Sequence, residues 1–248
     1  TDGQVLTSTG AGSPPAFEAI PSSGNRNKLI NGAITIAQQY GSTLQTGQDG
    51  SGGHYVDRWQ LVMNSAGTWT FGQVTESPNG FSNSFKADCT TTDGSLSAAD
   101  YIKFRQKLEG QDLQDFAKGT ADAKQFSVSF YVKTSKTGVY TVEVYDEDNT
   151  RCVSKTYTVS DTNWNRYTLT FPADTSGAFT NDANSSFHIA WWLGAGTNYT
   201  SGTFNNSAWA AASTTTRVSS SNVNLADNTS NTWHITGIQL EVGDVSTD

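Results

Sequence analysis

The sequence predicts an all-β protein, and an antiparallel jelly-roll β-sandwich is the preferred architecture. Three observations predict it: about ten short apolar runs, polar turns between these runs, and the lack of long helical patterns that could cover a parallel sheet. Period-two alternation is clearest at 126–133, where four apolar residues occupy the even positions. One face of such a strand is expected in a core and the other toward solvent or a partner.

Residues 1–27 are expected to form an extended arm or linker ahead of a single sandwich at 28–248. Gly, Ser, Thr and three prolines dominate the arm, which therefore cannot bury a core of its own. Its isolated apolar residues are Val5, Leu6, Phe17 and Ile20. They favour an arm that packs on neighbouring chains. Because the sequence begins at Thr1 and its sole methionine is Met63, we expect part of a longer protein.

Within the sandwich, expected strands follow one another along the chain. A short strand or hairpin is expected beside the Asn31-Gly32 turn. The clearest strand runs lie at 68–75, 81–89, 101–109, 125–134, 139–147, 155–160, 166–171, 187–193 and 233–242. One or two helical turns are expected at 110–119. The polar loop at 194–232 is long for a compact domain, so it is expected to be functional or ordered by a neighbour.

Composition narrows the classes of function. The chain of 248 residues is 35% hydrophobic and 11% aromatic, which is enough for a sizeable core. Its net charge of −8 and pI near 4.8 argue against nucleic acid as a partner. No apolar run is long enough to predict membrane insertion. Cys89 and Cys152 match no metal spacing and are expected to be free, buried thiols.

The titratable residues predict no catalytic or metal site. Asp146, Glu147 and Asp148 could supply paired carboxylates or calcium ligands, but a solvated hairpin tip is the favoured interpretation. The three histidines lack the close spacing of a metal site, and no phosphate loop, nucleophile elbow or dinucleotide fingerprint is present. We therefore expect no catalytic residue, no metal and no cofactor.

Aromatic residues are the candidate ligand contacts. Trp191 and Trp192 are adjacent, so in a strand their rings point to opposite faces and one ring leaves the core. Tyr199 and Trp209 lie in the long polar loop, a background typical of adaptable binding loops. These four residues are predicted to bind a ligand. In the alternative, the rings pin the loop onto its own sandwich or onto the next chain.

Several motifs resemble a known family. DGQVLTSTGAGSPPAFE, NKLINGAITIAQ, YVDRW, WWLGAGTNYTSG and WHITGIQLEVGD resemble the virion structural proteins and tail fibres of phages. The middle of the chain is also similar to carbohydrate-binding modules with a galactose-binding-like fold, at Ser129 to Lys133, Gly138 to Tyr140 and Trp164 to Tyr167. The resemblance implies a jelly roll, a place on the virion exterior and, frequently, a homotrimer. It implies no catalytic residue.

The resulting hypothesis is a non-enzymatic virion surface protein, part of a tail fibre or appendage, that attaches to a host surface glycan or protein. Its expected partners are copies of itself, other virion proteins and a bacterial surface glycan, with neither nucleic acid nor a membrane. Repeated weak contacts on several copies would gain avidity. The alternative is a capsid-decorating or tail-connecting protein that binds no receptor.

Overall fold

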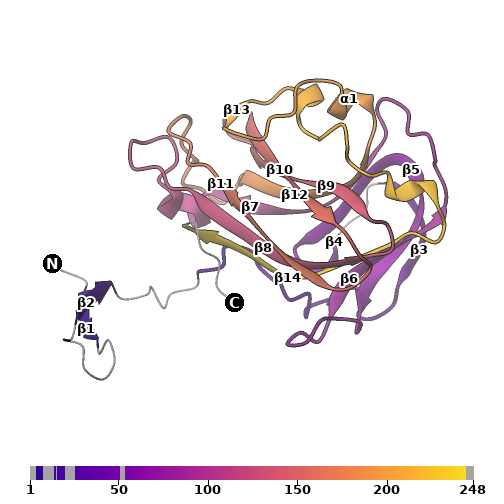
Figure 1. Cartoon of the computed structure of the whole chain (residues 1–248), viewed down its shortest axis with the longest axis horizontal. Coiled ribbons are helices and arrows are strands. Elements are labelled where there is room, and N and C mark those ends of the chain that lie inside the picture. The colour runs from indigo at the N-terminus through magenta and orange to yellow at the C-terminus, as the bar shows by residue number, and fades with distance from the viewer. Residues whose placement is uncertain (1–3, 8–13, 15, 20–25, 51–53, 244–248) are drawn as a thin grey trace.

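Two antiparallel sheets packed face to face form the body of the protein in a computed structural model, which describes residues 4–7, 14, 16–19, 26–50 and 54–243 (Figure 1). The strands of the first sheet are, in spatial order, β11 (Asn165–Phe171), β8 (Phe126–Thr134), β14 (Thr232–Val242), β6 (Ser84–Thr91), β5 (Trp59–Val74) and β3 (Gln45–Gly50). Those of the second are β4 (His54–Val56), β5 again, β7 (Tyr101–Glu109), β12 (Ser185–Ala195), β9 (Gly138–Asp146), β10 (Arg151–Val159) and β13 (Ala210–Ala211). The predicted antiparallel jelly-roll sandwich is confirmed.

Strand β5 belongs to both sheets. Its first part, at 59–64, pairs with β7, and its second part, at 68–74, pairs with β6. Between them, Ser65 and Gly67 have φ angles of +46° and +74°. A Cβ on Gly67 would lie 2.3 Å from the carbonyl oxygen of Thr91, so glycine is required at this bend. The change of direction carries one strand from the second sheet into the first.

Aromatic side chains from both sheets fill the space between them. The rings of Phe104 and Trp59 stack with centroids 4.8 Å apart, and Phe104 also contacts Phe85 and Trp233 of the first sheet at 4.4 and 5.7 Å. The apolar positions of 126–133 all face this core, as the alternation predicts. Burying a side chain of this kind stabilises the fold by roughly 1.5–3 kcal/mol.

Two short elements lie at the start of the chain and after β7. Strands β1 (Gln4–Thr7) and β2 (Ala16–Ala19) form a separate two-stranded hairpin, drawn apart from the sandwich in Figure 1. They fall within the predicted arm, whose boundary at residue 27 stays a prediction. The 3₁₀ helix η1 (Gly110–Phe116) occupies the region predicted to make one or two helical turns.

The predicted long loop at 194–232 includes the end of β12 and a segment that covers the second sheet. This segment contains α1 (Thr197–Thr200), β13 and η2 (Thr214–Thr216), and η3 (Leu225–Asp227) follows it. Asn205 Nδ2 donates to the Cys152 carbonyl at 2.8 Å, and Ser154 Oγ donates to the Arg217 carbonyl at 2.7 Å. Residues 196–224 are called the cover segment below.

Cys89 and Cys152 are both buried and unpaired, which confirms the expected free thiols. Burial raises the pKa of the Cys152 thiol to about 11. Across the described parts of the chain, no helix has the length and apolar character needed to span a membrane.

Candidate functional site

A pocket of about 420 Å³ opens on the outer face of the first sheet. Its floor is β14 around residues 237–239, and its walls come from β8, β11 and the turn before β6. Aromatic, amide and guanidinium groups line it together. These side chains are Asn27, Asn79, Phe81, Tyr131, Arg166 and Gln239. Aromatic rings with a few convergent polar groups are the usual lining of a ligand site.

Gly237 shapes the floor of the pocket. The pairing of β14 with β8 shifts register between Thr236 and Gln239, and Gly237 within this bulge has a φ of +61°. A Cβ at this position would lie 2.6 Å from Phe81 Cζ and 2.9 Å from Tyr131 Cδ2. Glycine therefore allows both rings to pack directly on the backbone of the bulge.

Asn27, which is distant from β14 in the sequence, holds the bulge in place through side-chain hydrogen bonds. Its Nδ2 donates to the Ile238 carbonyl at 3.0 Å, and its Oδ1 accepts from the Leu240 and Leu29 amides at 2.9 and 3.0 Å. The Ile238 amide donates to the Gly32 carbonyl at 3.0 Å. These bonds replace the ladder bonds that the bulge interrupts, so the floor of the pocket is held rigidly.

Phe81 and Tyr131 form the aromatic pair of the pocket. Their ring centroids are 5.4 Å apart with planes inclined at 56°, and both residues are half-buried. A tight turn presents Phe81: Ser77 Oγ donates to the Phe81 carbonyl at 2.6 Å, and the Phe81 amide donates to the Pro78 carbonyl at 3.2 Å. The pair leaves apolar ring surface at the pocket mouth.

Arg166 and Gln239 supply polar groups beside these rings. Arg166 lies directly opposite Tyr131 across the β11–β8 pairing. Ser129 Oγ donates to Gln239 Oε1 at 3.0 Å and accepts from Arg166 Nη2 at 3.5 Å. Apolar ring surface next to amide and guanidinium groups suits a ligand with one C–H-rich face and hydroxyls around its edge. A pyranose sugar has that form.

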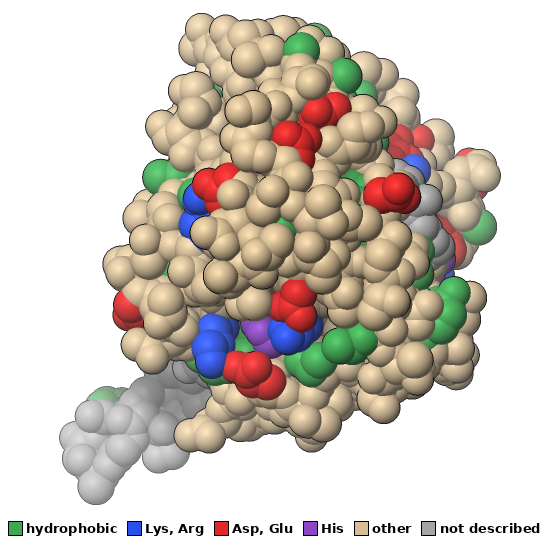
Figure 2. Space-filling model, turned by 90° about the vertical axis from the view of Figure 1, so that its right-hand side faces the viewer, with side chains coloured by type: hydrophobic (Ala, Val, Ile, Leu, Met, Phe, Trp, Pro, Cys, Tyr) green, Lys and Arg blue, Asp and Glu red, His purple; other side chains and the backbone are tan. Residues whose placement is uncertain are grey.

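A mixed charge cluster lies on the same face of the first sheet. Lys133 Nζ donates to Glu76 Oε1 at 2.5 Å, and Lys86 pairs with Asp88 at 2.7 Å. Burial, together with the nearby Lys86 and Lys133, lowers the pKa of His234 to about 4, so this ring is neutral at neutral pH. Figure 2 shows a side of the molecule on which uncharged side chains predominate and charges of both signs lie together.

No family model matches the sequence, and no curated protein does. Solved structures do. One is the enzymatically active domain of tailspike protein 4 of bacteriophage CBA120, at TM-score 0.45 and 15% identity, covering 88% of this chain and 22% of that one. The C-terminal family 22 carbohydrate-binding module of Clostridium thermocellum Xyn10B matches at TM-score 0.40 and 12% identity, covering 77% of this chain and 90% of the module. TmCBM61, solved with β-1,4-galactotriose, matches at TM-score 0.41 and 9% identity, covering 88% and 99%.

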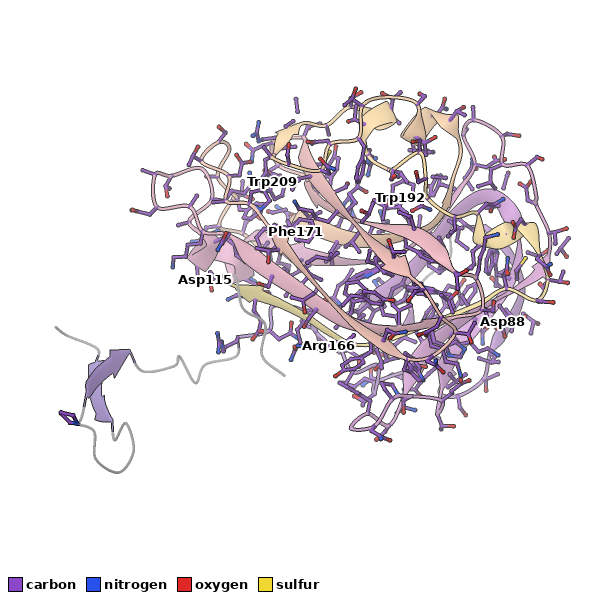
Figure 3. The ribbon with its side chains drawn as sticks, viewed as in Figure 1. Asp88, Asp115, Arg166, Phe171, Trp192 and Trp209 are labelled. Atoms are coloured by element: carbon purple, nitrogen blue, oxygen red, sulfur yellow. The ribbon has the colours of Figure 1, made fainter. Side chains whose placement is uncertain are left out.

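The structure places the two adjacent tryptophans on opposite faces of β12, as predicted. Trp191 points into the core and contacts Phe130 of the first sheet, with ring centroids 5.3 Å apart. Trp192 points outward, yet it is also 0% exposed because the cover segment lies over it. Figure 3 shows Trp192 beneath that segment and Arg166 on the other side of the sandwich. Trp192 thus leaves the core without reaching solvent.

Tyr199 and Trp209, also predicted as ligand contacts, pack inward from the cover segment. Tyr199 is half-buried, with its ring 5.2 Å from that of Trp192. Trp209 is 8% exposed, and its Nε1 donates to the Pro172 carbonyl at 2.9 Å. These contacts favour the alternative in which the rings pin the segment to its own sandwich. Ligand binding by the four aromatic residues stays a prediction.

A buried charged network lies beneath the cover segment. Glu143 on β9 is fully buried and accepts hydrogen bonds from Arg217 Nε, from Arg217 Nη2 at 2.9 Å and from Trp192 Nε1 at 3.1 Å. Burial alone would raise the pKa of Glu143, but the Arg217 guanidinium holds this pKa well below its usual range. The ion pair therefore fastens the cover segment to the sheet.

Glu147 continues this network at the end of β9. Its carboxylate lies 2.8 Å from His188 Nδ1 and accepts from Lys107 Nζ and Ser185 Oγ at 2.9 and 2.7 Å. Burial acts to raise the pKa of Glu147, whereas these partners lower it to about 2. The Tyr145 ring stacks on His188 at 5.0 Å. Like Glu143, Glu147 is thus committed to ion pairing within the fold.

The acids at 146–148 lie at the predicted hairpin turn, between β9 and β10, but only Asp148 is exposed to solvent. Asp146 is fully buried and lies 2.5 Å from Lys118 Nζ, which also pairs with Asp174 at 3.1 Å. Asp148 accepts from the Thr180 amide at 2.9 Å. The predicted solvation was wrong for Asp146 because the chain at 174–180 packs against this turn, a contact that a local pattern cannot show. Among the described residues, no three His, Cys, Asp or Glu side chains are grouped to hold a metal ion.

Proposed function

We propose that this chain is a non-enzymatic attachment module that binds a surface glycan in the pocket on the first sheet. The observation that carries the proposal is the half-exposed Phe81–Tyr131 pair, held rigidly beside Arg166 and Gln239. Rigid rings bind with little loss of conformational freedom, and neighbouring amide and guanidinium groups can pair with hydroxyls.

The pocket lining also supports a binding role without catalysis. Glycoside hydrolysis ordinarily requires two carboxyl groups flanking the scissile bond. The described residues that line this pocket include no Asp or Glu. The module is therefore proposed to hold a glycan and leave it intact.

A bacterial surface glycan array tests the site with matched variants. We expect Phe81→Ala and Tyr131→Ala each to weaken binding about tenfold, or about 1.4 kcal/mol, because either change removes ring area at the pocket mouth. Tyr199→Ala is the matched control, because Tyr199 is the one residue of the four sequence-predicted contacts that is not buried. Loss of binding only with Tyr199→Ala would move the site to the cover segment. Unchanged binding in all three variants would contradict both locations.

The proposed setting is the exterior of a virion, in a homotrimeric tail fibre or related appendage together with other virion proteins. The sequence resemblance supports this setting. Light scattering on the purified chain measures the trimer, and antibody-labelled electron microscopy of intact particles measures the location. Labelling on a capsid lattice combined with an empty glycan array would favour the decorating role.

A further inference from the structure

Among the described residues, the largely buried ammonium group of Lys103 on β7 has no hydrogen-bond acceptor. The residue is 6% exposed, and its side chain points to the outer face of the second sheet. Its Nζ lies 4.4 Å from the ring centre of Trp192 and 5.6 Å from that of Tyr101. Within the described part of the chain, it makes no hydrogen bond or ion pair. Ring faces attract a cation, but they replace only part of the hydration that burial removes.

Further cations surround this ammonium. Lys103, Arg105 and Lys107 alternate along β7, so they share one face at intervals of about 6.8 Å. Lys107 is paired with Glu147, whereas Arg105 Nε donates only to the neutral amide oxygen of Gln60, at 3.2 Å, among the described residues.

The carboxylates near these cations are already paired with other side chains. Glu147 acts on both Lys103 and Arg105 and is already paired with Lys107. Across β12, Ala190 lies between Arg105 and Glu143, which is the second carboxylate. It is engaged by Arg217 from the cover segment. Four cations, Lys103, Arg105, Lys107 and Arg217, therefore face two carboxylates, in a chain whose net charge is −8. Such an excess of positive charge around a buried lysine matches a missing anion.

We propose that the outer face of the second sheet holds a binding site for a small oxyanion, with Lys103 and Arg105 as its ligating residues. The oxyanion is a sulfate, a phosphate or the carboxylate of an acidic sugar. The half-buried Arg105 provides the approach from solvent. The site is independent of the glycan pocket on the first sheet.

The site fits a single anionic group and not an extended polyanion. Lys103 is accessible only in part, and the Tyr101, Trp192 and Tyr199 rings enclose the end of β7 around it. A guanidinium and an ammonium on one strand face can contact different oxygens of one oxyanion. Burial also lowers the pKa of Lys103 to about 7, a shift that a bound anion would oppose.

Sulfate titration of the whole chain, followed by amide NMR shifts and calorimetry, tests the proposal. Sodium chloride at equal ionic strength is the control for screening. We expect saturable shifts centred on β7 with sulfate, and an affinity about tenfold weaker in Lys103→Met and in Arg105→Gln. Lys124→Met, which removes an exposed lysine elsewhere, should bind sulfate as the native chain does.

Acidic and neutral sugars distinguish the source of the anion. Glucuronate shifts at β7, with none from glucose, would identify an acidic sugar, whereas sulfate and phosphate shifts alone would identify a free inorganic anion. Shifts equal to those in chloride, or full sulfate affinity in Lys103→Met, would overturn the proposal. Because the glycan array is read with Phe81→Ala and Tyr131→Ala, failure here leaves the glycan pocket untouched.

Discussion

The two outer faces of the sandwich carry similar aromatic and charged side chains, and they differ in what lies over them. On the first sheet, Phe81 and Tyr131 remain half-buried around an open pocket. On the second, the cover segment returns across the sheet and buries Trp192 and Glu143 completely. Whether an aromatic residue in a polar background is accessible to a ligand or packs within the fold thus depends on whether a distant segment covers it.

The sharpest test of this difference removes the cation that fastens the cover segment. Arg217→Met leaves Glu143 buried without its partner, and we expect a loss of about 3–5 kcal/mol in the free energy of unfolding. Lys133→Met, which removes the exposed pair with Glu76 on the open face, should cost less than about 1 kcal/mol. Urea denaturation at neutral pH measures both. Equal losses would show that the two faces are energetically alike.

A pH titration of stability sharpens the comparison further. The pKa of Lys103 is about 7 in the fold and about 10.4 when unfolded, so between these values the unfolded chain binds more protons. Stability should therefore rise with pH from 7 to 10 by roughly 2–4 kcal/mol from this group, and the contribution is lost as pH falls to 7.

The charged groups facing Lys103 are Glu143 on β9, Glu147 in the turn after β9, Arg217 on the cover segment and Arg105 on its own strand. Lys103→Met should remove the rise and stabilise the chain at pH 7, as measured by thermal unfolding across this range. A native-like pH profile in Lys103→Met would assign the effect to another residue.

A smaller effect is expected from the floor of the open pocket. Gly237→Ala places a Cβ against Phe81 and Tyr131 at a positive φ, which should cost about 1–2 kcal/mol and displace both rings. Glycan affinity should fall with stability in this variant. Gly41→Ala is a useful control, because Gly41 lies outside the pocket, its φ is also positive and no atom lies near the added Cβ. Equal affinity losses in the two variants would point to backbone strain instead of ring displacement.

The smallest expected effect is the loss in the free energy of unfolding of Phe81→Ala. Since the ring is only half-buried, its removal should cost about 1 kcal/mol or less in urea denaturation while weakening glycan binding. A loss comparable to that of a core phenylalanine, such as Phe130→Ala at about 3–5 kcal/mol, would make Phe81 a structural residue.

The strands with one buried face could be predicted closely from sequence. The prediction at 101–109 coincides with β7, because its apolar residues alternate with charged ones. For β10, the predicted start at 155 missed Arg151 to Ser154. Cys152, Val153 and Ser154 are all buried, since the cover segment lies over the outer side, and burial on both sides removes the alternation. The single strand β5 was not predicted because the bend at 65–67 interrupts its period.

The candidate pocket was harder to predict, because its parts come from five separate stretches of sequence. Two local signals were present. A glycine at position 237 interrupts a strand pattern, which commonly marks a bulge or a close approach, and the turn Ser77–Gly80 directly precedes a phenylalanine. Neither signal shows that Tyr131 lies beside Phe81, because that contact depends on the register of β8 against β14.

The bend of β5 limits how recombination could transfer this domain from one longer protein to another. Since one continuous strand supplies an inner member to each sheet, a cut at 65–67 would leave both sheets with a missing strand and an exposed half of the core. Recombination therefore cannot divide the domain at this bend without disrupting both sheets. The sandwich can be inherited, duplicated or fused only as an undivided whole.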